Sequence, residues 1–126
     1  MAPREKIAIL PLGATEQHGP HLPPETDWII AEAIARRACE AGGKMNVEVL
    51  PVEKVGYSIE HSDDSRTTSL GFEEAVGRWI GIGETLCRRG IRKLVLLNAH
   101  GGNSPLMTVA ATELRVRCGI LTVATS

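Results

Sequence analysis

The sequence predicts an α/β protein, a three-layer sandwich with a mostly parallel sheet. Short apolar runs alternate along the chain with longer segments in which apolar residues recur at helical spacing. The runs are apolar on both faces, which is typical of parallel strands that helices cover on both sides. The 126 residues suit one domain, so we expect a single α/β domain over residues 1–126.

The first third of the chain is expected to hold a strand, an ordered loop and a helix. Residues 6–12 form an apolar run closed by glycine, the pattern of a buried strand. Glycine and three prolines make residues 14–25 a loop. Thr26 is the expected N-cap of a helix that ends at the glycine pair 42–43. Apolar residues recur along it at helical spacing, at Ile30, Ile34 and Ala38.

Two more strands and a second helix follow. Residues 47–55 read as a strand broken near Pro51, and residues 56–71 as a long polar loop. A helix then extends to Gly90, with one face lined by Phe72, Val76, Trp79, Ile80 and Cys87. Residues 93–97 form the third strand.

The last helix and strand complete a β-α-β-α-β-α-β order. Ser104 is the expected N-cap, Pro105 takes the first helical position, and the inward face holds Leu106, Ala110 and Leu114. Residues 120–124 begin a fourth strand. With no helix after this strand, we expect one face of it to be uncovered and the fold to be truncated.

The composition disfavours several classes of protein. A formal net charge of −1 and the lack of a basic run give no reason to expect nucleic acid or a membrane surface as partner. No apolar stretch approaches the ~20 residues of a membrane helix. Three widely spaced cysteines without a C-x-x-C pair predict reduced, buried thiols in a cytoplasmic protein. No G-x-G-x-x-G follows the first strand, which argues against a nucleotide-binding Rossmann fold.

Side chains able to bind metal follow two of the expected strands. Ligands of open α/β sheets bind outside the carboxyl ends of the strands. Glu16 and His18 come after the first strand and point to the same side if the segment is extended. Asp27 lies at the mouth of the first helix, and His100 follows the third strand. We expect these two carboxylates and two imidazoles to converge.

Such a set suits Zn, Mn or Fe(II) better than an all-oxygen Mg or Ca site. Asp27 is the natural bridge, because one carboxylate can bind two ions. A pair of ions ~3.5–4 Å apart can hold a water molecule and lower its pKa towards ~7. The resulting bridging hydroxide can attack an amide carbonyl. The cluster therefore favours two divalent metal ions as cofactors.

Simpler interpretations exist for each of these residues. Asp27 in the first turn of a helix can merely complement the helix dipole. A single histidine on a loop is often a hydrogen-bonded surface residue. The glycines 101 and 102 can serve only to let the chain turn after the strand. Spacing alone leaves these alternatives open.

Two segments resemble signatures of a known family. LPLGATEQHGPHLPPETD (residues 10–27) resembles the first signature of the creatininase family, and LVLLNAHGGN (residues 94–103) resembles the second. The resemblance implies metal-dependent hydrolysis of a C–N bond in a cyclic amide, linear amide or formamide. It implies one ion on Glu16 and His100, the other on His18, and Asp27 bridging both. It also implies a homo-oligomer, commonly a hexamer.

The same motifs supply candidates around the metals. We expect His21 to orient a ligand carboxylate from behind the site. Asn98 and Asn103, which bracket Gly101 and Gly102, are expected to anchor the loop or the substrate.

Residues 56–70 resemble the substrate loop of the family. Glu60-His61 is kept, which makes His61 the candidate catalytic residue beside Asp27, and Thr68 is a candidate substrate contact. Ser65-Arg66 stands where Pro-Gly is usual, so the substrate loop is expected to differ in shape.

A second departure concerns the acid–base chemistry. Creatininase itself has a glutamate where this chain has Gly102, and members with His-Gly-Gly-Asn take a further ligand and their acid–base residues from a C-terminal half. We therefore expect an N-terminal portion that binds metal and hydrolyses little by itself. The alternative is a catalytically inactive, metal-binding assembly subunit of the same family.

Overall fold

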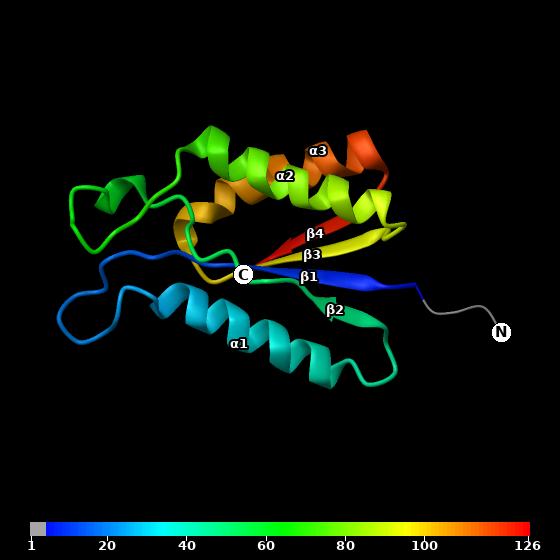
Figure 1. Ribbon diagram of the computed structural model, residues 1–126, viewed down its shortest axis with the longest axis horizontal. Coiled ribbons are helices and arrows are strands. Elements are labelled where there is room, and N and C mark those ends of the chain that lie inside the picture. The colour runs from blue at the N-terminus through cyan, green and yellow to red at the C-terminus, as the bar shows by residue number, and fades with distance from the viewer. Residues whose placement is uncertain (1–4) are drawn as a thin grey trace.

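The fold is a parallel α/β sandwich, as the sequence predicts (Figure 1). The computed structural model describes residues 5–126. Within that range the elements are β1 (Ile7–Leu12), α1 (Thr26–Ala41), β2 (Val47–Val49), α2 (Phe72–Arg88), β3 (Lys93–Asn98), α3 (Ser104–Cys118) and β4 (Leu121–Thr125). The strands pair in parallel in the order β2-β1-β3-β4. One face of the sheet is covered by α1 and the other by α2 and α3 (Figure 1).

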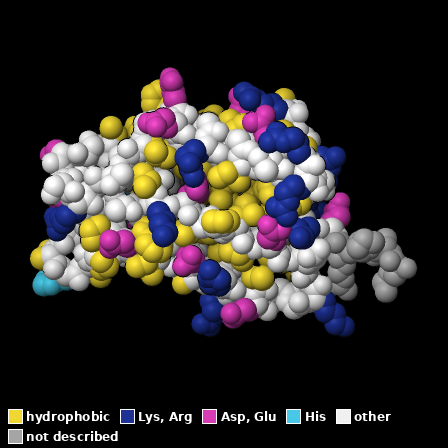
Figure 2. Space-filling model, in the orientation of Figure 1, with side chains coloured by type: hydrophobic (Ala, Val, Ile, Leu, Met, Phe, Trp, Pro, Cys, Tyr) yellow, Lys and Arg dark blue, Asp and Glu magenta, His cyan; other side chains and the backbone are white. Residues whose placement is uncertain are grey.

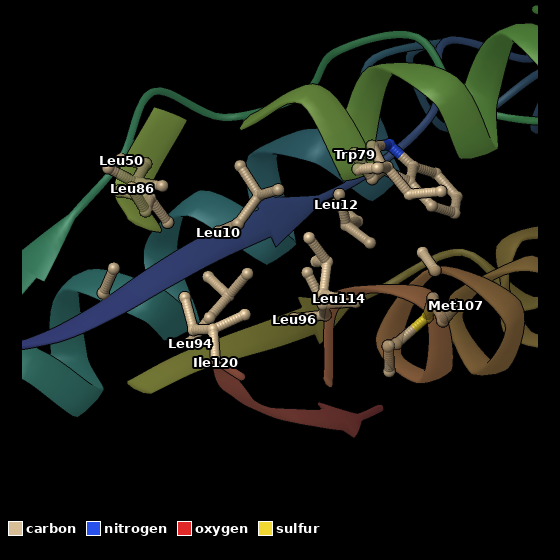
Figure 3. Close-up of a cluster of buried hydrophobic side chains, with 14 of the residues drawn as sticks. Leu10, Leu12, Leu50, Trp79, Leu86, Leu94, Leu96, Met107, Leu114 and Ile120 are labelled. Atoms are coloured by element: carbon tan, nitrogen blue, oxygen red, sulfur yellow. The ribbon is translucent and has the colours of Figure 1, made fainter. Parts of the chain in front are cut away.

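The main hydrophobic core lies between the sheet and the α2–α3 pair (Figure 3). Alternate residues of β1 and β3 point into it, among them Leu10, Leu12, Leu94 and Leu96. Trp79 from α2 and Leu114 from α3 are fully buried against them. Of the inward face predicted for α2, Trp79 and Ile80 are buried, whereas Phe72 is 56% exposed. Phe72 is the first residue of α2.

The α1 layer is thinner, and its buried face differs from the predicted one. Ala31 and Ala35 are buried, whereas Ile30 and Ile34 are about half exposed, at 46% and 51%. Small side chains let α1 lie close to the sheet, and this closeness brings the start of the helix to the carboxyl end of β1. Ile30 and Ile34 each come one residue before a buried alanine, so they lie about 100° around the helix from the buried face and point outward.

The second strand is shorter than predicted, ending at Val49 instead of residue 55. The strand stops just before Pro51, which has no N–H for the sheet. Pairing resumes at Glu53, whose N–H donates to the carbonyl of Pro11 and whose carbonyl accepts from Gly13. The Glu53 carboxylate also binds Arg78 of α2 in bidentate fashion, at 2.7 and 3.0 Å. These contacts fix the path of the chain into the long loop 56–71.

Two predicted helix caps are wrong by one residue. Thr26 is the first residue of α1, and its hydroxyl donates to the carbonyl of Pro23 instead of capping the helix. Ser104 likewise lies inside α3, because a 3₁₀ turn (Gly101–Asn103) leads directly into it and makes Asn103 the N-cap. At the other end of α3, Gly119 takes the left-handed conformation that ends the helix.

The edge strand β4 is covered on one side only, as expected. Thr122 is buried on the side of α3, while Leu121 and Val123, which face the α1 side, are 54% and 48% exposed. Elsewhere the surface mixes apolar and charged side chains, and a hollow lined in part by Leu50, Pro51 and Ile82 lies between α2 and the segment after β2 (Figure 2).

Among residues 5–126, no helix is long and apolar enough to cross a membrane. The three cysteines are unpaired, as expected, but half-buried instead of buried.

We predict that Leu114→Ala lowers the free energy of unfolding by about 2–5 kcal/mol, because it opens a cavity under α2 and against the sheet. Chemical denaturation measures the change. Val116→Ala on the same helix is the matched control, since Val116 is 79% exposed and such changes stay within about 0.5 kcal/mol. Equal effects of the two substitutions would show that the core is not packed as described.

Candidate metal centre

Glu16, His18, Asp27 and His100 converge at the carboxyl ends of β1 and β3. Glu16 and His18 lie on the loop after β1, Asp27 lies in the first turn of α1, and His100 follows β3. Glu16, Asp27 and His100 are buried, with 7%, 8% and 4% of their surfaces exposed. His18 closes the solvent side of the cluster with 20% of its side chain exposed. The predicted convergence of these four residues is what the structure shows.

Hydrogen bonding fixes which nitrogen of His100 carries hydrogen. The Nε2 atom lies 2.8 Å from the carbonyl oxygen of Tyr57. A carbonyl oxygen only accepts, so Nε2 must be the N–H. In the neutral ring, Nδ1 then has a lone pair. It faces Oδ2 of Asp27 at 3.0 Å and Oε1 of Glu16 at 3.1 Å, both of which are acceptors as well.

His18 repeats the arrangement with its nitrogens exchanged. Its Nδ1 donates to the backbone carbonyl of Glu16 at 2.8 Å, so Nε2 holds the lone pair and faces Oδ1 of Asp27 at 3.0 Å. The Glu16 carbonyl raises the pKa of His18 above its usual 6.5; burial opposes this shift, and the negative charge of Asp27 adds to it. Asp27 thus turns one oxygen to each histidine.

Lone pairs that face carboxylate oxygens repel each other unless a cation lies between them. Each histidine can resolve the conflict by taking a proton, or a metal ion can bind both partners. Metal-binding histidines usually donate a hydrogen bond from their second ring nitrogen to a carbonyl or carboxylate oxygen. His18 and His100 both do so here. The second oxygen of Glu16, Oε2, is buried and has no partner among residues 5–126. The donor set therefore fits divalent metal ions, with one oxygen of Asp27 turned to each histidine.

Two asparagines hold the loop that carries His100. Asn98 accepts from the His100 N–H and donates to the His100 carbonyl. Asn103 is fully buried and donates to Gly13, at the end of β1, and to Asn98. It also accepts from the N–H of Tyr57. The asparagines anchor three segments to each other, as predicted for the loop.

The close approach of Tyr57 explains Gly102. A Cβ atom at position 102 would lie 2.5 Å from the Tyr57 carbonyl oxygen and 2.7 Å from Nε2 of His100. Only glycine leaves room for the hydrogen bond that orients His100. Gly101 is exposed with no such neighbour. Ser58 completes the orientation, since its buried hydroxyl lies 3.1 Å from the same Nε2. No sequence signal pointed to Tyr57 or Ser58.

The loop at residues 56–70, which resembles the substrate loop of the family, is joined to the segment that carries Glu16. The N–H of Thr68 donates to the Thr15 carbonyl, and the hydroxyl of Thr67 accepts from the N–H of Gln17. Thr67 therefore contacts the Glu16 segment through its side chain. Thr68, the predicted substrate contact, pairs with that segment through its backbone, and its side chain is exposed. Arg66, which stands where glycine is usual in the family, binds Asp64 and donates to the Gly19 carbonyl at 3.3 Å. It therefore connects the loop 56–70 to the loop after β1.

The other two histidines are placed differently. His21 is exposed and, in the described part of the chain, no hydrogen bond joins it to the cluster, contrary to the predicted place behind the metals. The cause is the sharp turn at Gly19, which pairs His18 with Leu22 and leaves His21 at its tip. His61 lies near the site, since one of its ring nitrogens is within 4.8 Å of ligand atoms of Glu16 and Glu60.

Fold and cluster together define a parallel α/β protein with a candidate dinuclear metal site at the carboxyl ends of its strands. A family model described as creatinine amidohydrolase matches residues 1–125. The chain belongs to the creatininase family. It spans about half the length of the curated relatives that it matches, for example 45% of a mycofactocin precursor peptide peptidase.

Relatives with three different names match to similar extents. The mycofactocin precursor peptide peptidase of Mycobacterium tuberculosis is 37% identical over 117 residues, or 85% of this chain. The creatinine amidohydrolase of Pseudomonas putida is 33% identical over 88% of this chain and 43% of its own length. A formylaminopyrimidine deformylase of Methanobrevibacter smithii is 37% identical over 82% of this chain and 44% of its own length.

Solved structures agree with the fold. A structure titled as creatininase with Mn superposes with a TM-score of 0.83 at 32% identity, covering 97% of this chain and 51% of the other. A mutant creatininase titled as the Zn–Zn type gives a TM-score of 0.80 at 33% identity, covering 97% of this chain and 50% of the other.

We predict that Gly102→Ala weakens the affinity for zinc by roughly 10–100-fold, because a methyl group there displaces His100 from the Tyr57 carbonyl. Competition with a zinc chelator measures the affinity. Gly101→Ala is the matched control and is expected to bind zinc as the wild type does. If both variants bind alike, the Tyr57 contact does not orient a ligand.

Without metal, His18 is expected to make stability depend on pH. Its folded-state pKa lies above 6.5, so its contribution is fully present below the unfolded value and is lost as the pH rises through the folded value. In EDTA, the stability difference between wild type and His18→Asn should be larger at about pH 5.5 than at about pH 9. Urea denaturation at the two pH values measures it, and a difference that grows with pH would contradict the assignment.

Proposed function

We propose that this chain carries the metal site of an amidohydrolase that cleaves a C–N bond in a small amide, cyclic amide or formamide. The observation that carries the proposal is the pair of histidine lone pairs turned toward the two oxygens of Asp27. The names of the relatives, creatinine amidohydrolase, deformylase and peptidase, support hydrolysis of a C–N bond.

The residues of the cluster take distinct roles in this proposal. Glu16 and His100 would hold one ion, His18 would hold the other, and Asp27 would serve both. When bound, the ions would polarise the scissile carbonyl and lower the pKa of a water molecule. The Tyr57 carbonyl keeps the hydrogen of His100 on Nε2, and Ser58 and Asn98 hold the ring and its backbone in place.

His61 is proposed as a catalytic residue at the open side of the site. It lies on the loop 56–71, and one of its ring nitrogens is within 4.8 Å of a carboxylate oxygen of Glu16. A group that helps a proton reach the leaving nitrogen typically contributes about 10²–10⁴ in rate.

Zn, Mn and Fe(II) all suit the two carboxylates and two imidazoles of the cluster. Three further expectations stay predictions: a single domain over residues 1–126, a homo-oligomer and a cytoplasmic location.

Asp27→Ala is predicted to lose both ions together, because one carboxylate serves both. Glu16→Ala should mainly weaken the ion at His100, since Nδ1 of His100 lies 3.1 Å from Oε1 of Glu16. Elemental analysis after equilibration with matched zinc measures ions per chain. Glu73→Ala, an exposed carboxylate on α2, is the control and should keep the wild-type content. Full occupancy in Asp27→Ala would contradict the bridging role.

Hydrolysis is tested with matched metal loading on this chain and on a version extended to the length of the relatives. Creatinine, an aryl formamide and a short peptide serve as substrates. We expect EDTA-sensitive turnover by the extended version that Asp27→Asn abolishes, and little turnover by the 126-residue chain. Metal binding by both versions without turnover of any amide would favour the alternative, an inactive metal-binding assembly subunit.

A further inference from the structure

A second group of possible ligands adjoins the metal centre. Glu16, Glu60 and His61 each offer one ligand atom, and these atoms lie within 4.8 Å of one another. Oε1 of Glu16 faces His100, and its Oε2 is buried without a hydrogen-bond partner among residues 5–126. Taken by residue type alone, two carboxylates and an imidazole describe a site for a third cation.

Hydrogen bonding to Gln17 argues against a metal on His61. The N–H of Gly19 donates to Oε1 of Gln17 at 3.0 Å, which fixes the orientation of the amide group. The amide nitrogen Nε2 is therefore the atom that faces Nδ1 of His61, at 3.4 Å. An amide nitrogen only donates, so Nδ1 accepts and the hydrogen of the neutral ring is on Nε2.

This arrangement is the reverse of that at the two metal ligands. His18 and His100 each have a carbonyl oxygen behind the ring, which leaves a lone pair toward the carboxylates. His61 has an N–H donor behind the ring, which leaves an N–H on the other nitrogen. An N–H cannot bind a metal ion, but it can donate a hydrogen bond to an atom with a lone pair.

We propose that Gln17 is a positioning residue that holds His61 as the Nε2–H tautomer, so that His61 is a hydrogen-bond donor and not a third metal ligand. This proposal rests on the proposed function: the hydrogen bond from Nε2 of His61 is accepted by the carbonyl oxygen or the leaving nitrogen of the amide substrate. Glu60 is exposed beside the ring and offers an acceptor. Donor and acceptor together complement the C=O and N–H of an amide group.

The tautomer is measured by long-range ¹H–¹⁵N correlation spectra of zinc-loaded protein labelled in its histidines, at about pH 8, where an ordinary imidazole is neutral. The signals of His61 are assigned by their loss in His61→Asn. We expect the hydrogen on Nε2 in the wild type. In Gln17→Glu a carboxylate accepts from Gly19 and from the ring, so the hydrogen should move to Nδ1. His21→Asn is the control and should leave these signals unchanged.

An Nδ1–H tautomer in the wild type, or no change in Gln17→Glu, overturns the proposal. Zinc content gives an independent measure: wild type and His61→Asn should bind equal numbers of ions, and a third ion lost in His61→Asn also overturns it. Failure of the proposed function is distinct from either result. It would appear as absence of zinc from both proteins, while the tautomer of His61 could still be read.

Discussion

The site depends on one electrostatic constraint: two imidazole lone pairs and three carboxylate oxygens face one another with no hydrogen between them in the neutral state. Asp27 is central to it because its oxygens face His18 and His100 separately. Burial makes the repulsion costly, since a low-dielectric surrounding strengthens interactions between like partial charges. A cation shared by these atoms removes the conflict, and a divalent ion also balances the two carboxylate charges.

The rest of the fold serves to keep those atoms together. The carboxyl ends of β1 and β3 are adjacent because the strands pair in register up to Leu12 and Asn98. Ala31 and Ala35 let α1 lie close enough for Asp27 to reach the same edge. Asn103 then connects β1, the loop after β3 and the substrate loop through three hydrogen bonds. A polar residue buried in this way is stable only because its groups are paired.

Sequence patterns predicted the parts that depend on local or periodic information. The parallel order, the positions of α2 and β3 and the convergence of the four ligands follow from apolar periodicity and from the rule for strand ends. The break near Pro51 was predicted, but the strand was extended past it to residue 55. The buried face of α1 was missed, because the packing of Ala31 and Ala35 depends on contacts with the sheet. Tyr57 was unpredictable as a site residue, since its backbone carbonyl makes the contact and every residue has one.

His21 and His61 show that residue type alone does not decide whether a histidine binds a metal ion. His21 lies in the same motif as Glu16 and His18, and His61 lies in the loop 56–70 that resembles the substrate loop of the family. Yet the turn at Gly19 leaves His21 exposed, and Gln17 places a donor against Nδ1 of His61. What separates a metal-binding histidine from a hydrogen-bonding one is the group on its second nitrogen: a carbonyl oxygen behind the ring leaves a lone pair in front, and an amide N–H leaves a hydrogen. That group comes from a backbone atom or a neighbouring side chain. The role of each histidine here therefore follows from the fold of the loops and not from the motif that contains it.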